Sequence, residues 1–243
     1  MKNRNIIVVI IVFLSFQAKA QYKDLEAWYT VGVTKKLNSK WNVGLAEEFR
    51  FNSNALHLDK HFTDLQFKYK KRNWIYYQLG ARYYFDKSKD NYWNGALRIN
   101  ADLYFKAKKE DFSFVSRTRF QTSLNEENTI GRLHSDEALF REKFTLKYNF
   151  KKYNLKPFFS AEFFLEDYFV FNTEADAKKP LSVKLESNKI RLKIGTEWKI
   201  NKQHYLKFFY GYQQELNQVI NQRNYILSIG YTYKLPNKKR DEK

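Results

Sequence analysis

The chain lacks cysteine altogether and is poor in proline and glycine. Its 243 residues include no Cys, 3 Pro and 8 Gly. Without cysteine, neither a disulfide framework nor a thiolate metal site can hold the fold together. No glycine-rich phosphate loop is present, and the length suits one domain, because all-β barrels often reach this size undivided.

A long hydrophobic run is also missing beyond the N-terminus. After residue 20, no segment approaches the roughly 18 consecutive apolar residues that identify a transmembrane helix. If the chain is a membrane protein, it is therefore not a helical one. Only a closed barrel would then satisfy every backbone polar group inside lipid.

The first 20 residues have the pattern of a secretory signal peptide. Lys2 and Arg4 form a positive start, Ile6–Phe16 is apolar, and Ala18-Lys19-Ala20 provides small residues before a cut. The apolar stretch is too short for an anchor, since spanning the hydrocarbon takes about 20 residues. We therefore expect residues 1–20 to be removed and the mature chain to begin at Gln21.

Charged and aromatic residues are plentiful. They make up 29% and 19% of the chain, and the formal net charge is +18. So basic a chain invites a nucleic-acid interpretation. The Lys and Arg residues are not gathered on one element, however, and many fall in short turns, so we expect no nucleic-acid partner.

The dominant pattern is an alternation of period two. In residues 189–200, apolar side chains from Ile190 to Ile200 share one face, and charged side chains from Lys189 to Lys199 share the other. A helix of period 3.6 would scatter those charges around its axis. Such alternation suits a barrel that shows one face to lipid and the other to a polar interior.

Eleven segments share this alternation, most of them 9–15 residues long. The clearest are 74–85, 93–105, 189–200 and 225–235; weaker copies occupy 24–35, 41–52, 62–70, 112–121, 138–150, 157–166 and 204–213. Membrane strands need about 9–11 residues, and aromatic residues gather toward segment ends, as interfacial girdles would require.

The fold expected is all-β, an antiparallel transmembrane β-barrel of about 10–12 strands. The range reflects a conflict, because bacterial single-chain barrels have even strand numbers. Either one segment is miscounted or part of the N-terminal stretch is not a wall strand. The adjacent pair Glu47-Glu48 is expected to mark a bulge that shifts the register.

The connections alternate between short and long, which sets the expected orientation. Links such as Lys36–Lys40 and Lys71–Asn73 would be short periplasmic turns, and Asn52–His61 or Thr122–Glu137 would be longer external loops. The expected organisation is a signal peptide at 1–20, an outer-membrane β-barrel at 21–235 and a basic tail at 236–243.

The polar faces of the segments supply candidate lumen-lining charges. They are Arg50, Arg82, Arg98, Asp102, Arg117, Arg119, Arg141, Glu162, Arg191, Glu197 and Lys207. An arginine-rich lining could make a pore that favours anions. Both signs of charge are present, however, and buried charges must be paired. In so narrow a barrel, we favour side chains that interlock across the lumen.

No set of residues indicates catalysis or metal binding. His57, Asp59 and His61 alternate and could share a face, but no fourth ligand is identifiable. His134-Ser135-Asp136 superficially resembles a hydrolase motif, yet adjacent residues of an extended chain point to opposite faces. We expect no catalytic residue, metal or cofactor from these patterns.

Several stretches carry a family resemblance. VTKKLNSKWNVGL and EEFRFN within Gln21–Asn52, HFTDLQFKYK at His61–Lys70, and the following LGARYYF resemble the family of secreted proteins described as domain of unknown function 2490 (DUF2490). The resemblance covers nearly all of the mature chain. It implies an outer-membrane barrel and supplies no reaction or catalytic residue.

The expected role is a non-enzymatic outer-membrane barrel that is structural, binds a ligand or forms a narrow porin-like channel. Membrane lipid and the barrel-assembly machinery would be its partners. One alternative is a barrel enzyme acting on lipid or peptide. Another is a soluble periplasmic barrel with its apolar faces inward around an apolar ligand, because alternation alone does not say which face is inside.

Overall fold

The computed structural model describes residues 23–87, 93–125, 138–169, 183–216 and 223–236. The expected signal peptide, all but the first residue of the expected tail, and His134-Ser135-Asp136 lie outside these ranges. Within them, no helix has the length and apolar character needed to cross a bilayer.

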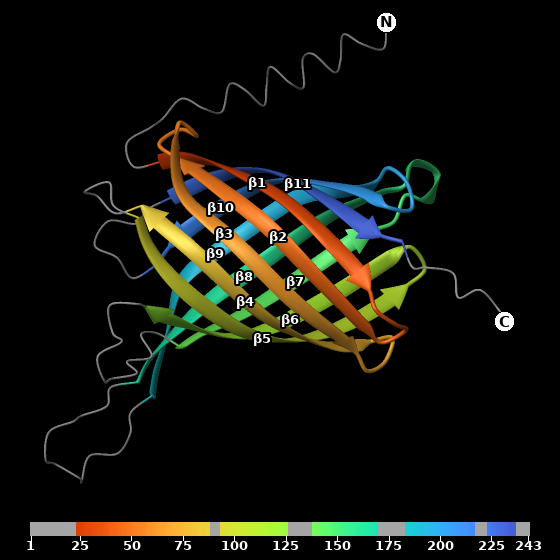
Figure 1. Cartoon of the computed structure of the whole chain (residues 1–243), viewed down its shortest axis with the longest axis horizontal. Coiled ribbons are helices and arrows are strands. Elements are labelled where there is room, and N and C mark those ends of the chain that lie inside the picture. The colour runs from red at the N-terminus through yellow and green to blue at the C-terminus, as the bar shows by residue number, and fades with distance from the viewer. Residues whose placement is uncertain (1–22, 88–92, 126–137, 170–182, 217–222, 237–243) are drawn as a thin grey trace, which may run out of the picture.

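Eleven strands form one closed barrel, with each strand tilted across the wall (Figure 1). In chain order they are β1 (Lys23–Lys36), β2 (Trp41–Asn52), β3 (His57–Lys70), β4 (Ile75–Lys87), β5 (Trp93–Lys109), β6 (Phe112–Asn125), β7 (Ala138–Tyr148), β8 (Leu155–Phe169), β9 (Val183–Lys199), β10 (His204–Glu215) and β11 (Arg223–Leu235). All eleven alternating segments are therefore wall strands, and the strand number falls within the expected range.

The closure of the barrel differs from the fully antiparallel one expected. Each pair of consecutive strands is antiparallel, but β1 pairs with β11 in parallel, with Lys23 opposite Arg223 and Lys35 opposite Leu235. An odd number of up-and-down strands leaves the first and last running the same way. The conflict over parity is thus resolved by the seam, with no strand miscounted; odd-stranded barrels also occur in mitochondrial outer membranes.

The two ends of the barrel differ in their connections. We call one end the turn end; its links are residues 37–40, 71–74, 110–111, 149–154 and 200–203, and the fourth contains a 3-10 turn, Lys151–Tyr153. The opposite end, which we call the loop end, carries 53–56, 88–92, 126–137, 170–182 and 216–222.

Two expectations about β2 and β3 are wrong. The link between them is the short turn 53–56 instead of a long loop, and Ser53, Asn54 and Ala55 adopt positive φ within it. The register passes unbroken through Glu47 and Glu48, and it shifts where Arg50 faces Lys60 but Phe51 faces Leu58. Asp59 is the extra residue of this bulge. It shifts the alternation by one position, so the sequence pattern alone does not reveal how early β3 begins.

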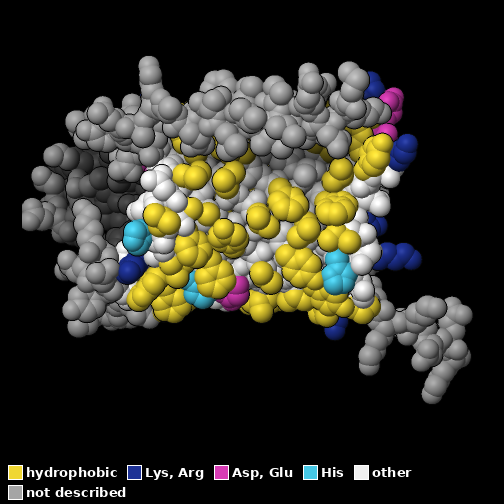
Figure 2. Space-filling view, turned by 90° about the horizontal axis from the view of Figure 1, so that it is seen from above, with side chains coloured by type: hydrophobic (Ala, Val, Ile, Leu, Met, Phe, Trp, Pro, Cys, Tyr) yellow, Lys and Arg dark blue, Asp and Glu magenta, His cyan; other side chains and the backbone are white. Residues whose placement is uncertain are grey.

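The apolar rows point outward. Hydrophobic side chains cover much of the face seen in Figure 2, and Ile194 and Leu79 are 63% and 62% exposed. Asp102 and Glu162, which alternate with such residues, are buried inside. The structure is therefore the reverse of the alternative in which the apolar faces point inward around an apolar ligand.

Two carboxylates interrupt the outward apolar rows, and each has two hydrogen-bond partners there. Glu47 Oε2 lies 2.7 Å from His61 Nε2 and accepts a hydrogen bond from Thr63 Oγ1 at 3.0 Å. Glu142 accepts hydrogen bonds from the hydroxyls of Ser116 and Thr118, both at 2.6 Å. Cross-strand neighbours therefore compensate for an acidic side chain on an otherwise apolar surface.

Candidate functional site

One half of the polar interior is built around Asp102 on β5, whose side chain is 0% exposed. Arg119 on β6 donates to both carboxylate oxygens, from Nε at 2.6 Å and from Nη2 at 2.7 Å. Asn100 and Tyr104 donate to the same carboxylate at 3.1 and 3.2 Å. The buried charge is therefore paired in the planar, two-bond geometry that Arg and carboxylate favour.

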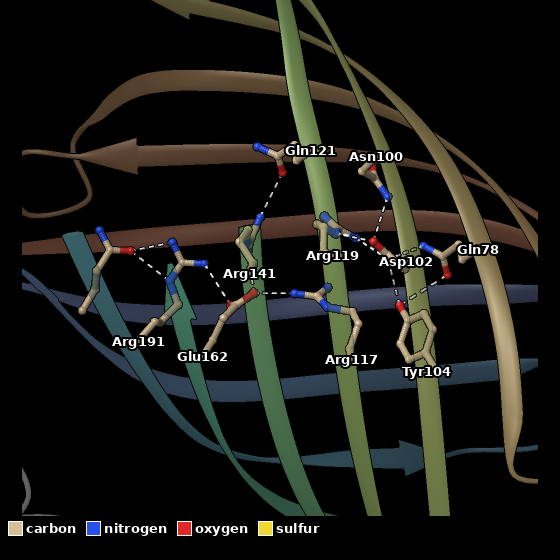
Figure 3. Close-up of polar contacts among 11 residues, drawn as sticks. Gln78, Asn100, Asp102, Tyr104, Arg117, Arg119, Gln121, Arg141, Glu162 and Arg191 are labelled. Atoms are coloured by element: carbon tan, nitrogen blue, oxygen red, sulfur yellow. Dashed lines mark hydrogen bonds and ion pairs between the residues drawn. The ribbon is translucent and has the colours of Figure 1, made fainter. Parts of the chain in front are cut away.

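The other half is built around Glu162 on β8, whose side chain is 3% exposed. Three guanidinium groups converge on it: Arg117 and Arg141 contact Oε1, the latter at 2.6 Å, and Arg191 lies 3.5 Å from Oε2. Figure 3 shows these side chains meeting from adjacent strands. We call Asp102, Arg117, Arg119, Arg141, Glu162 and Arg191 the central charge network.

The ends of this network are held by uncharged side chains. Arg141 donates to Gln121 at 3.2 Å, and Arg191 donates to Gln213 from Nε at 2.9 Å (Figure 3). The guanidinium of Arg191 also lies 5.1 Å from the ring centre of Trp28 on β1. Contacts of the network thus continue past the β1–β11 seam to β1.

A second layer lies beside β1, β2 and β3. Arg82 pairs with Asp64 through two hydrogen bonds of 2.6 Å, and Arg50 pairs with Glu48 at 2.5 Å. The guanidinium of Arg50 stacks 3.8 Å from the ring centre of Trp28, a close cation–π contact. These pairs bring further candidate residues into the same interlocked interior.

The remaining candidates lie apart from the central charge network. Arg98 donates to Ser123 at 3.2 Å and lies over Tyr84 at 4.7 Å. Glu197 pairs with Lys147 at 2.7 Å near the turn end. Lys207 lies over the ring of Phe158 at 5.1 Å and directly faces Glu197 across the β9–β10 pair.

Several contributing residues are uncharged and were not among the candidates. Gln78, Asn100, Gln121 and Gln213 lie on the same polar faces, so the period-two phasing could have found them if amides had been counted with charges. Trp28 is an aromatic residue on a polar face. Only its partners reveal that position, because strand propensity would place it on either side.

The loop end opens into a polar hollow of about 420 Å³. Trp28, Arg50, Phe62, Arg98 and Arg191 are part of its lining, with acidic residues such as Glu26 and Glu215 closer to the rim. Arg191 belongs to both the hollow and the central charge network. The network therefore forms part of the floor on which a molecule entering from the loop end would rest.

The histidine cluster does not form the site that its spacing suggested. The bulge at Asp59 puts His57 opposite Asn52 and His61 opposite Phe49, so the two histidines fall on opposite faces. Among the described residues, no group of three His, Cys, Asp or Glu side chains is arranged to hold a metal ion. The chemistry that the interior offers is ion pairing and hydrogen bonding.

Comparison with known proteins gives a family and no activity. No curated protein matches the chain. A family model described as "Protein of unknown function (DUF2490)" matches residues 25–224, which is most of the sequence, and the chain therefore belongs to that family.

Proposed function

We propose that this chain is an outer-membrane β-barrel that binds a ligand at its mouths and whose central charge network keeps the lumen closed to free solute flow. The inference of a closed lumen depends on one observation, the convergence of Arg117, Arg141 and Arg191 on the buried Glu162. Side chains that bridge β6, β7, β8 and β9 in this way occupy the interior of a narrow barrel.

The outer surface supports a membrane location. Leu65, Ile99 and Ile229 are exposed apolar residues in the middle of their strands. A surface of this kind is unfavourable in water and suits hydrocarbon. The strands, 11 to 17 residues long, have at least the length of about 9–11 residues that a tilted membrane strand needs.

The tryptophans support the same proposal. Trp41, Trp74 and Trp198 are exposed at the turn end, and Trp93 is exposed at the start of β5, at the loop end. Only Trp28, of the five, points into the barrel, where it is buried. Tryptophan is enriched at both interfaces of membrane proteins, so the four outward rings would mark the two edges of the hydrocarbon layer.

The signal-peptide pattern of residues 1–20 supports export, and the short links support a periplasmic turn end. In this orientation the loop-end hollow opens to the outside. Membrane lipid and the barrel-assembly machinery would be the partners during insertion.

Planar-bilayer recordings of the refolded mature chain test the closed lumen. We expect little steady conductance from the wild type. Glu162→Gln removes the charge that holds three arginines together, so we expect frequent openings from that variant. Glu142→Gln is the matched control, because Glu142 points outward and its loss leaves the interior unchanged. Steady, porin-sized conductance of the wild type would contradict the proposal.

A further inference from the structure

Lysine and arginine are distributed unevenly along the interior. Along β7 the inward order from loop end to turn end is Arg141, Lys143, Lys147, and along β9 Arg191 precedes Lys193. On β5, Arg98 lies toward the loop end and Lys106 toward the turn end. Arginines and carboxylates therefore predominate in the middle and the loop-end half, where Lys60 and Lys189 also line the hollow, whereas the inward cations of the turn-end half are lysines.

Several turn-end lysines form no ion pair with a described carboxylate. Of the carboxylates described at this end, Glu197 is paired with Lys147 at 2.7 Å and Asp111 with Lys151 at 2.7 Å. The contact with Asp111 raises the pKa of the Lys151 ammonium group above its usual value. Lys68 and Lys106 have no carboxylate partner in the described part of the chain, and Lys106 is repelled by Lys70 and Lys147.

The same repulsion extends inward toward the central charge network. Lys193 is repelled by both Lys143 and Lys207. Beside them, the hydroxyl of Ser160 is buried, with the residue 1% exposed, and has no hydrogen-bond partner. Ser160 faces Lys193 across the β8–β9 pair. Glu162 attracts Lys143 and Lys193, but the cations outnumber the carboxylates here. An excess of cations next to an unused hydroxyl forms an environment that an anion would stabilise.

The turn end also has room for a ligand. A hollow of about 380 Å³ is lined by Lys36, Lys40, Lys68, Lys70 and Lys106, with the rings of Trp41 and Tyr76 and no carboxylate. Small-molecule sites commonly occupy a few hundred Å³. We refer to it as the lysine hollow.

We propose that the lysine hollow binds a small, soluble anion that carries more than one phosphate group. Lys is a compact point charge that suits phosphate, whereas Arg favours the planar two-bond pairing with carboxylates seen in the central charge network. Five lysines with no acid among them match a multiply charged ligand better than a single carboxylate. Lys68 lies over the ring of Tyr104 inside the barrel, 5.1 Å from the ring centre, and Lys106 follows on the same inward face of β5, which favours a solute at the turn-end mouth over a lipid headgroup on the outer wall.

This inference names a ligand class for the proposed function but depends only on the barrel, so its test needs no membrane. Pyrophosphate and tripolyphosphate are titrated calorimetrically into the refolded mature chain, in zwitterionic detergent at one fixed low salt concentration. We expect binding that strengthens from pyrophosphate to tripolyphosphate. Failure of this titration would leave the conductance test of the closed lumen intact.

Paired substitutions locate the site. Lys68→Gln with Lys106→Gln should weaken tripolyphosphate binding by about tenfold or more, because each loses a charge-assisted hydrogen bond. The matched control is Lys35→Gln with Lys152→Gln, which removes two exposed lysines at the same end outside the hollow. It should change affinity by less than about twofold. Lys68→Arg with Lys106→Arg, which keeps both charges, should retain binding.

Two outcomes would overturn the inference. One is the absence of binding by the wild type at millimolar tripolyphosphate, and the other is equal weakening of binding in the hollow and control pairs. If the Lys68 and Lys106 double variant does not refold, Lys70→Gln replaces it. Lys70 is an exposed rim residue of the hollow, and unchanged affinity in that variant would overturn the inference.

Discussion

Arg119 and Asp102 meet inside the barrel through two parallel hydrogen bonds, 2.6 and 2.7 Å long, and the Asp102 side chain is wholly buried. Removing either residue would leave the charge of the other uncompensated in the interior. The pair links β5 to β6, so it also fixes the register of two strands at mid-height.

Asp102→Asn should destabilise the barrel by about 3–5 kcal/mol, because it leaves the Arg119 guanidinium buried without a counter-charge. Urea unfolding of the detergent-folded protein measures the change. A double variant, Asp102→Leu with Arg119→Met, should recover much of the loss, since it removes both charges together. A double variant as unstable as Asp102→Asn would show that the pair is not an isolated unit.

Ile194→Arg should block insertion into lipid vesicles. Ile194 is 63% exposed on the outward face of β9, and an arginine near the bilayer midplane costs about 2–4 kcal/mol. Refolding yield into vesicles is the measurement, and Ile194→Leu is the control, which should insert normally. Unchanged insertion of the arginine variant would show that this row does not face hydrocarbon.

Arg98→Ala should leave insertion intact while changing the loop-end hollow. Arg98 contacts Ser123 and the Tyr84 ring but no carboxylate in the described strands. Its loss therefore leaves no carboxylate without its counter-charge. The expected destabilisation is about 1 kcal/mol, well below that of Asp102→Asn. Unfolding and conductance are measured on the same sample to test this prediction. If neither changes, Arg98 has no role in the lumen.

The parallel seam predicts which residues can be cross-linked. Val31 lies opposite Tyr231 across β1 and β11, and facing residues in a sheet have Cα atoms close enough for a disulfide. The chain has no native cysteine, so Val31→Cys with Tyr231→Cys should form the sole disulfide on oxidation. Val31→Cys with Leu227→Cys, four residues out of register, should not. Cross-linking of the second pair in place of the first would contradict the seam.

The sequence predicts the fold well because alternation reports burial directly. In β9, the five apolar and five charged residues of the segment 189–200 separate by face, and the structure keeps that phasing throughout. The start of β3 was missed because the Asp59 bulge shifts the phase by one residue. The parallel seam follows from the odd number of strands that the eleven segments predict.

The contacts within the site were less predictable, because the face on which a side chain lies does not specify which residues it contacts. Alternation cannot say that Arg117 and Arg191 reach the same Glu162 from different strands. Such contacts depend on strand register and on side-chain reach across the wall. The lysine hollow was missed for a similar reason: its residues come from three separate stretches of sequence, and only the barrel brings them to one end.

The most direct test of the account places single nitroxide labels along β9, at each position from 190 to 198 except Gly195, where a Cβ would clash with the backbone oxygen of Phe208, in protein refolded into lipid vesicles. Collision rates with oxygen, which concentrates in hydrocarbon, and with a water-soluble nickel complex are then compared by electron paramagnetic resonance. We predict oxygen maxima at positions 190, 192, 194, 196 and 198, alternating with minima at the positions between. High nickel accessibility at Ile194, or oxygen maxima at Arg191 and Lys193, would contradict a barrel that turns its apolar rows to lipid.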